Sequence, residues 1–281
     1  MKRMIAVLLC LSIVFLMFSC GKLDEAIDSK ENSNSHIQIV GSSYFYVDSP
    51  WADEYYDDQV LQEMDITFDG TTYHVFYDES MKMEYDYYPR HTYRDLSKDA
   101  KFCLDPDGNL VYALIHNMKG EPLESPLSVE QGMKLAEKFL STLVKDPDQY
   151  TASDTSTLGD TSVYHYVKYV DSWKTADEIW IHVNQSMGKI YGFDGRMLDK
   201  IDTDMFVTFN QSAIEYILTE QINEMYAENQ YIDWVECKFE HVLTMVGPTE
   251  YGVISEATID CYSKDFDYIV NTEGLWFLIS P

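Results

Sequence analysis

The feature that most constrains the fold is an amphipathic helical pattern followed by alternating strand-like runs, which occurs twice along the chain. Apolar residues recur every three or four positions in residues 129–143 and again in residues 214–225, so each segment is expected to bury one face of a helix. Ser128 and Gln131 fit the capping box that begins a helix. Strand-like runs follow each helix. The two patterns start roughly 80 residues apart, which indicates a divergent structural repeat.

The first third of the chain has a different character. Residues 37–122 are rich in tyrosine and in short alternating runs, with turn residues at Asp69-Gly70 and at 105–108, so β-hairpins are expected there. The sequence therefore predicts an α+β protein: a β-rich N-terminal segment followed by two helix-on-antiparallel-sheet units. The expected divisions are a β-rich domain at 37–122, an α+β domain at 123–205 and a second, divergent α+β unit at 206–281.

The formal net charge of the chain is −28. Such an acidic field argues against nucleic acid as a partner, because each phosphate contact needs a cation on the protein. No metal site or cofactor is expected, since the histidines lack HExxH spacing and the cysteines lack CxxC spacing. The chain is therefore predicted not to be an enzyme. A hydrolase that uses an unrecognised carboxylate pair is the alternative, although such pairs arise by chance among 48 acidic residues.

Aromatic side chains in the first third are candidates for a recognition surface. Tyrosine and tryptophan combine an apolar ring with a polar tip, which favours them at binding surfaces. One alternative function is a cell-wall or glycan-binding lipoprotein that uses these rings. The other interpretation is that they are half-buried strand residues. The candidates are Trp51, Tyr55, Tyr56, Tyr85, Tyr87 and Tyr88.

Two cysteines near the C-terminus are candidates for a disulfide. Apolar residues alternate on both sides of Gly247-Pro248, which predicts a hairpin. A register in which the numbers of opposed residues sum to 498 keeps both apolar sets on one face, and it places Cys237 opposite Cys261 and Lys238 opposite Asp260. Opposed β-carbons in such a ladder are about 4.5 to 5.5 Å apart. A bridge is therefore possible after small adjustment, and its oxidation depends on the compartment.

The N-terminus has the features of an export signal. Lys2 and Arg3 precede an apolar run at residues 5–18, which is too short to cross a bilayer comfortably. The run ends in Leu16-Met17-Phe18-Ser19-Cys20-Gly21, which resembles the lipobox of bacterial lipoproteins. The resemblance implies removal of residues 1–19 and lipidation of Cys20, with fatty acyl chains holding the protein on the extracytoplasmic face of the cell membrane. The alternative is an ordinary secretory signal with an incidental cysteine. Residues 20–36 are polar and are expected to form a flexible tether.

A second resemblance concerns residues 127–193. Leu127-Ser128-Val129-Glu130-Gln131-Gly132-Met133-Lys134-Leu135-Ala136, followed by residues 179–184 and Gly188-Lys189-Ile190, is similar to a PepSY-type domain. That family includes propeptides of secreted peptidases and envelope proteins such as the spore germination protein YpeB. The resemblance implies a non-catalytic module that contacts a partner protein. We therefore expect a non-enzymatic envelope lipoprotein that restrains or stabilises an exported protein.

Overall fold

The computed structural model describes residues 37–41, 60–78, 90–97, 99–105, 107–196, 198–202, 209–245, 251–263 and 268–280. The chain forms two compact units. Unit 1 comprises Met1–Tyr44, Phe209–Glu240 and Ile254–Pro281, and unit 2 comprises Phe45–Thr208 and His241–Val253. The domain boundaries expected at residues 122 and 205 stay predictions.

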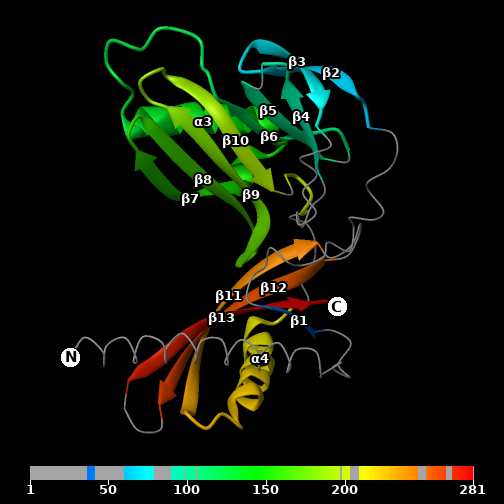
Figure 1. Ribbon diagram of the computed structural model, residues 1–281, viewed down its shortest axis with the longest axis vertical. Coiled ribbons are helices and arrows are strands. Elements are labelled where there is room, and N and C mark those ends of the chain that lie inside the picture. The colour runs from blue at the N-terminus through cyan, green and yellow to red at the C-terminus, as the bar shows by residue number, and fades with distance from the viewer. Residues whose placement is uncertain are drawn as a thin grey trace, which may run out of the picture. The chain divides into compact units, whose positions relative to one another are not determined.

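Unit 2 begins with a run of antiparallel hairpins (Figure 1). The turn between its first two strands has Asp69 and Gly70 at φ values of 46° and 74°, the left-handed conformation that Asn, Asp and Gly tolerate in hairpin turns. Both hairpins expected from the sequence are confirmed. The strands are β2 (Glu63–Phe68), β3 (Thr71–Tyr77), β4 (His91–Asp95), β5 (Ala100–Leu104) and β6 (Leu110–Ile115).

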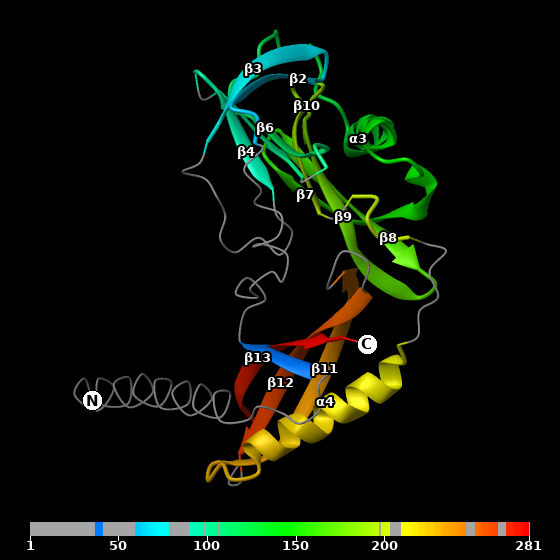
Figure 2. The same cartoon turned by 90° about the vertical axis from the view of Figure 1, so that its right-hand side faces the viewer.

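The second part of unit 2 is a helix and four longer strands. They are α3 (Val129–Leu143), the short 3-10 helix η3 (Pro147–Gln149), β7 (Tyr150–Leu158), β8 (Thr161–Val170), β9 (Trp173–Asn184) and β10 (Lys189–Arg196). The predicted capping box is present, with the Ser128 hydroxyl accepting from the Gln131 amide and the Gln131 side chain accepting from the Ser128 amide. Helix α3 lies on one face of the sheet (Figure 2) and contacts β8, β9 and β10.

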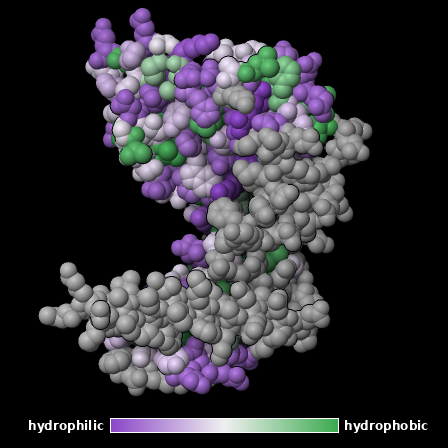
Figure 3. Space-filling model, viewed as in Figure 1, coloured by the Kyte–Doolittle hydropathy of each residue, from purple (hydrophilic) through white to green (hydrophobic). Residues whose placement is uncertain are grey.

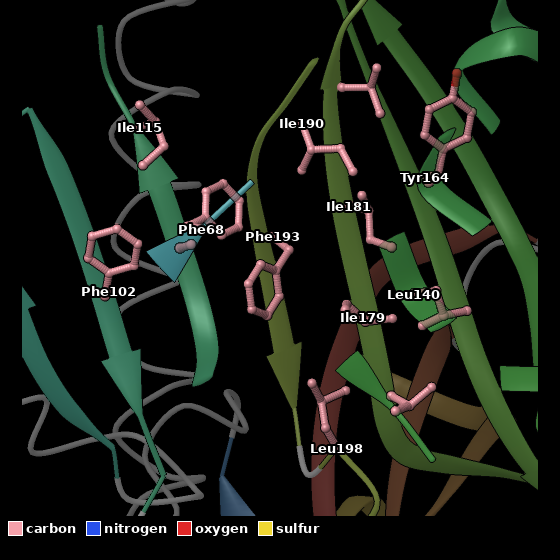
Figure 4. Packing of buried hydrophobic residues seen from close by; sticks show 14 of the residues in the cluster. Phe68, Phe102, Ile115, Leu140, Tyr164, Ile179, Ile181, Ile190, Phe193 and Leu198 are labelled. Carbon is pink, nitrogen blue, oxygen red and sulfur yellow. The ribbon is translucent and has the colours of Figure 1, made fainter. Parts of the chain in front are cut away.

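The core of unit 2 lies between α3 and the sheet. Phe68 stacks on Phe193 with ring centroids 6.1 Å apart, and Phe193 meets Phe139 of α3 edge-on at 5.5 Å. The same cluster includes Phe102 and Leu140, so strands from the first third and the helix share one apolar interior (Figure 4).

Gly132 sets the distance between α3 and β8. A β-carbon at this position would lie 2.3 Å from the Tyr164 hydroxyl oxygen, and that hydroxyl donates to the Val129 carbonyl at 2.7 Å. Gly132→Ala should therefore destabilise the protein by about 1 to 2 kcal/mol in urea unfolding, because overpacking outweighs the gain in helix propensity. In a Tyr164→Phe background the same substitution should cost less, and an equal cost would contradict this explanation.

Unit 1 contains helix α4 (Gln211–Tyr226), the strands β1 (Ile37–Gly41) and β13 (Ile269–Ile279), residues 254–263 of β12 (Tyr251–Ser263) and residues 232–240 of β11 (Ile232–Met245). Strand β1 pairs antiparallel with β13, and the strand order continues through β12 to β11. Asn210 caps α4 by accepting from the Ala213 amide. Tyr226, at the end of α4, donates to Glu273 of β13 at 2.5 Å.

The predicted fold class is wrong. The described residues form one mixed sheet of thirteen strands with two α-helices, and they do not form two helix-on-antiparallel-sheet units. Strand β6 of the first third pairs with β10, so the N-terminal hairpins extend the sheet that α3 covers. The sheet is mixed because Val242 and Leu243 of β11 pair in parallel with Lys174 and Thr175 of β9. Neither helix in the described ranges is long and apolar enough to span a membrane.

Candidate functional site

The face of the unit 2 sheet that points away from α3 carries polar and aromatic side chains. Side chains alternate between the two faces of a strand, so residues next to the buried Ile179, Ile181 and Phe193 point to the opposite side. Figure 3 shows a mostly hydrophilic surface over unit 2. We call this group the open face: Arg90, Lys101, Tyr112, His165, Glu178, Trp180, His182, Tyr191, Asp194 and Arg196.

Strand pairing brings distant parts of the chain into one row on the open face. Tyr112 of β6 lies opposite Asp194 of β10, Asp194 lies opposite Trp180 of β9, and Trp180 lies opposite His165 of β8. Directly opposed residues share a face and lie close enough to interact. Four strands thus supply a continuous row of side chains.

Trp180 lies at the centre of a cluster of stacked groups. The His165 ring stacks on the Trp180 ring at 4.4 Å with 4° between their planes, and the Arg196 guanidinium carbon lies 4.7 Å from the indole centroid. Glu178 bonds to His165 Nε2 at 2.9 Å and accepts from Arg196 at 3.5 Å. These contacts hold Trp180 and Arg196 in fixed positions at a partly exposed site.

A second cluster surrounds Tyr112. The Arg90 guanidinium and the Lys101 ammonium lie 5.6 and 5.1 Å from its ring centroid, and Arg90 also donates to Asp194 at 3.0 Å. Burial raises the pKa of the Tyr112 hydroxyl, and burial lowers the pKa of His182, so both groups stay neutral at pH 7. In a strongly acidic chain, the open face thus gathers three cations with aromatic rings. Its chemistry favours recognition by stacking and ion pairing.

A buried polar cluster lies elsewhere in unit 2. Asp177 is fully buried, accepts from Tyr150 at 2.5 Å and faces Lys168 Nζ at 3.6 Å. Burial raises the pKa of Asp177 to about 7. The Tyr150 hydroxyl also accepts from the Asp199 amide at 3.4 Å. The cluster joins β7, β8, β9 and the chain after β10, and its burial separates it from any substrate.

One cavity of about 420 Å³ lies in unit 2, near the ends of β2 and β3. Its polar groups bond to one another or to nearby backbone. Asp99 accepts from Asn117 at 2.6 Å, and Lys189 donates to the Lys119 carbonyl at 2.8 Å.

Most of the site residues predicted from the sequence lie outside the described residues. They are Cys20, Trp51, Tyr55, Tyr56, Tyr85, Tyr87 and Tyr88. Within the described part of the chain, no group of three His, Cys, Asp or Glu side chains is placed to hold a metal ion.

The predicted register of the C-terminal hairpin agrees with two contacts between β11 and β12. Lys238 donates to Asp260 at 3.3 Å, as expected, and Tyr262 donates to Glu236 at 3.1 Å, which is the next pair on that face. The same register places Cys237 opposite Cys261. Both are thiols in the structure, so the disulfide stays a prediction.

Oxidation of the purified protein with oxidised glutathione should link Cys237 to Cys261 and leave Cys103 reduced. Burial raises the pKa of Cys261 to about 11 and also raises the pKa of Cys237, so the reaction should be slow at pH 7 and faster at pH 9. The bridge should stabilise the protein by roughly 3.5 kcal/mol for a loop of about 25 residues. Non-reducing peptide mapping checks the link, and a bridge to Cys103 would contradict the register.

The open face was not singled out from the sequence. No sequence motif connects His165, His182, Trp180 and Arg196. The alternation of Glu178, Trp180 and His182 with apolar residues places these three on one strand face. The open-face residues on β6 and β10 join this group through pairing between distant strands, which no local sequence pattern predicts.

No protein-family model matches the sequence, and no curated protein matches it. Among solved structures, the chain is similar to the Bacillus megaterium YpeB C-terminal domain, with 13% sequence identity and a TM-score of 0.35. The match covers 80% of this chain and 94% of that chain. We infer neither a shared site nor a shared activity from a similarity of this size.

Proposed function

We propose that this chain is a non-enzymatic, membrane-anchored envelope lipoprotein that binds a partner protein through the open face of unit 2. The observation that carries the proposal is the placement of Trp180, Tyr112, Arg90 and Arg196 on one face of a sheet. Tryptophan, tyrosine and arginine are the residue types that contribute most binding energy at protein interfaces.

The contacts within the open face favour binding of a protein surface. Glu178 and Asp194 fix Arg196 and Arg90, so little side-chain entropy is lost when a partner binds. A suitable partner presents carboxylates to the cations of this face and apolar groups to its aromatic rings. The PepSY-like sequence pattern supports the same class of function, an interaction that restrains or stabilises an exported protein. The lipobox-like sequence at Cys20 supports attachment to the membrane.

Site-specific photo-crosslinking tests the proposal in cells that produce the protein. A photoreactive amino acid at position 191, on the open face, should form an adduct of one defined mass. The same amino acid at position 158, where Leu158 is 87% exposed on β7, serves as the matched control and should not form it. Trp180→Ala in the same chain should abolish the adduct, because the stacked cluster is lost.

Binding of the purified partner gives the quantitative test. Arg196→Ala should weaken the affinity about tenfold or more, the size expected for an interface arginine, and Leu158→Ala should leave the affinity unchanged. Adducts of equal yield at positions 191 and 158 would contradict the proposal. So would full affinity in both Trp180→Ala and Arg196→Ala.

A further inference from the structure

One edge of strand β11 in unit 1 pairs with no other described strand. Strand β11 has β12 on one side, and its pairing with β9 on the other side involves Val242 and Leu243 alone. Among the described strands, none pairs with the other side of residues 232–238, which we call the β11 edge. Backbone donors and acceptors along such an edge can bind a further strand.

The side chains beside the β11 edge form an aromatic and acidic surface. Trp234, which is 47% exposed, stacks on Tyr262 with ring centroids 3.7 Å apart and planes 5° from parallel. Tyr262 donates to Glu236 on the same face of the sheet. Among the described residues near this edge the one cation is Lys238, which Asp260 holds at 3.3 Å. A strand added here would therefore meet an aromatic stack and carboxylates.

The negative charge of unit 1 favours binding of a basic strand. Its described residues include one basic side chain, Lys238, against ten carboxylates: Glu215, Glu220, Glu224, Glu228, Asp233, Glu236, Glu240, Glu256, Asp260 and Glu273. A second copy would bring the same excess of negative charge to the edge, and repulsion between the copies opposes that pairing. A basic segment meets the opposite field and is attracted.

We propose that the β11 edge binds an extended, basic peptide segment of a partner protein by strand addition. The peptide backbone bonds to the edge, and lysine or arginine side chains at alternate positions lie beside Glu236 and Glu240. The Trp234 ring forms a cation–π contact with one of these lysine or arginine side chains. This site is independent of the open face, because it lies on unit 1 and uses backbone pairing.

The test uses the full-length protein in a non-ionic detergent and a fluorescent peptide of nine residues with lysine at alternate positions and threonine between them. Fluorescence anisotropy should show saturable binding that weakens as salt rises. Two control peptides separate the contributions: one has N-methylated backbone amides, and the other has glutamate in place of lysine. Both should lose binding. Hydrogen exchange should slow at residues 232–238 when the lysine peptide binds.

Charge-reversal variants locate the site. Glu240→Lys, two residues beyond the β11 edge and on the same strand face as Glu236, should weaken binding of the lysine peptide about tenfold. Glu228→Lys, an exposed acid beyond α4 in the same unit with the same change in net charge, should change it less than twofold. Trp234→Ala should weaken binding without changing the circular dichroism spectrum of the sheet. Equal effects of both lysine variants, full binding of the N-methylated peptide, or self-association that protects residues 232–238 without peptide would each overturn the proposal.

Discussion

Lys168→Met should destabilise the protein by about 1 kcal/mol more at pH 8 than at pH 5, because one pH unit above the Asp177 pKa is the range over which the lost ion pair counts. Lys168 and Asp177 have side chains that are 6% and 0% exposed, and their charged atoms lie 3.6 Å apart. Asp177 Oδ2 is buried without a hydrogen bond. Removing the ammonium therefore leaves a buried carboxylate without its compensating charge whenever Asp177 is ionised.

The pH dependence follows from the pKa of Asp177. Burial raises that pKa to about 7 in the folded protein, whereas an unfolded aspartate has a pKa of about 3.9. The folded state binds this proton more tightly, so the contribution of Asp177 to stability is present at low pH and is lost as the pH rises from about 4 to about 7. Without Lys168 the folded pKa rises further, and the loss continues to higher pH. At pH 5 the carboxyl group is neutral in both folded proteins.

Urea unfolding at pH 5 and pH 8 checks this prediction. The double variant Lys168→Met/Asp177→Asn removes both charges and keeps an oxygen that accepts from Tyr150. It should be more stable than Lys168→Met at pH 8. Ionisation of Asp177 lowers the unfolding free energy between pH 5 and pH 8, and the double variant should not show this decrease. An equal loss in Lys168→Met at both pH values would show that the two charges do not interact.

The sequence predicts those elements of the fold that depend on contacts between residues a few positions apart. The capping box at Ser128 and Gln131 begins α3, and Asp69-Gly70 makes the turn between β2 and β3. Strand β7 was not predicted. Its sequence YTASDTSTL is polar, and after Tyr150 its side chains are almost all exposed, so no apolar alternation marks it. Pairing with β8 along its length holds it in the sheet.

The arrangement of the sheet depends on pairings between distant residues. Helix patterns near residues 129 and 214 indicated two separate helix-on-sheet units. Instead, the pairing of Leu114 with Gly192 joins β6 to β10, and the pairing of Val242 with Lys174 joins β11 to β9. The open face and the buried Asp177 arise from these pairings. In the structure Asp177 shares a strand face with Ile179 and Ile181, and its partner Tyr150 lies on β7.

Cys20→Ala should abolish labelling of the protein by a fatty acid analogue. In the proposed lipoprotein the Cys20 thiol forms the thioether, and alanine has no atom that can replace it. Each buried methylene of an acyl chain contributes about 0.8 kcal/mol to membrane binding, and two signals together give stable anchoring. Loss of the lipid removes this contribution to membrane binding.

Labelling is the decisive measurement for Cys20→Ala, because an uncleaved signal can still bind the membrane through its apolar run at residues 5–18. Cys10→Ala is the matched control, since it removes a cysteine from that run and leaves the lipobox-like sequence intact. The wild type and Cys10→Ala should be labelled, and both should migrate as the processed form. Cys20→Ala should be unlabelled and should migrate as the longer precursor. Equal labelling of Cys20→Ala and Cys10→Ala would exclude the anchor, and the proposed partner would then have to be sought among freely secreted proteins as well.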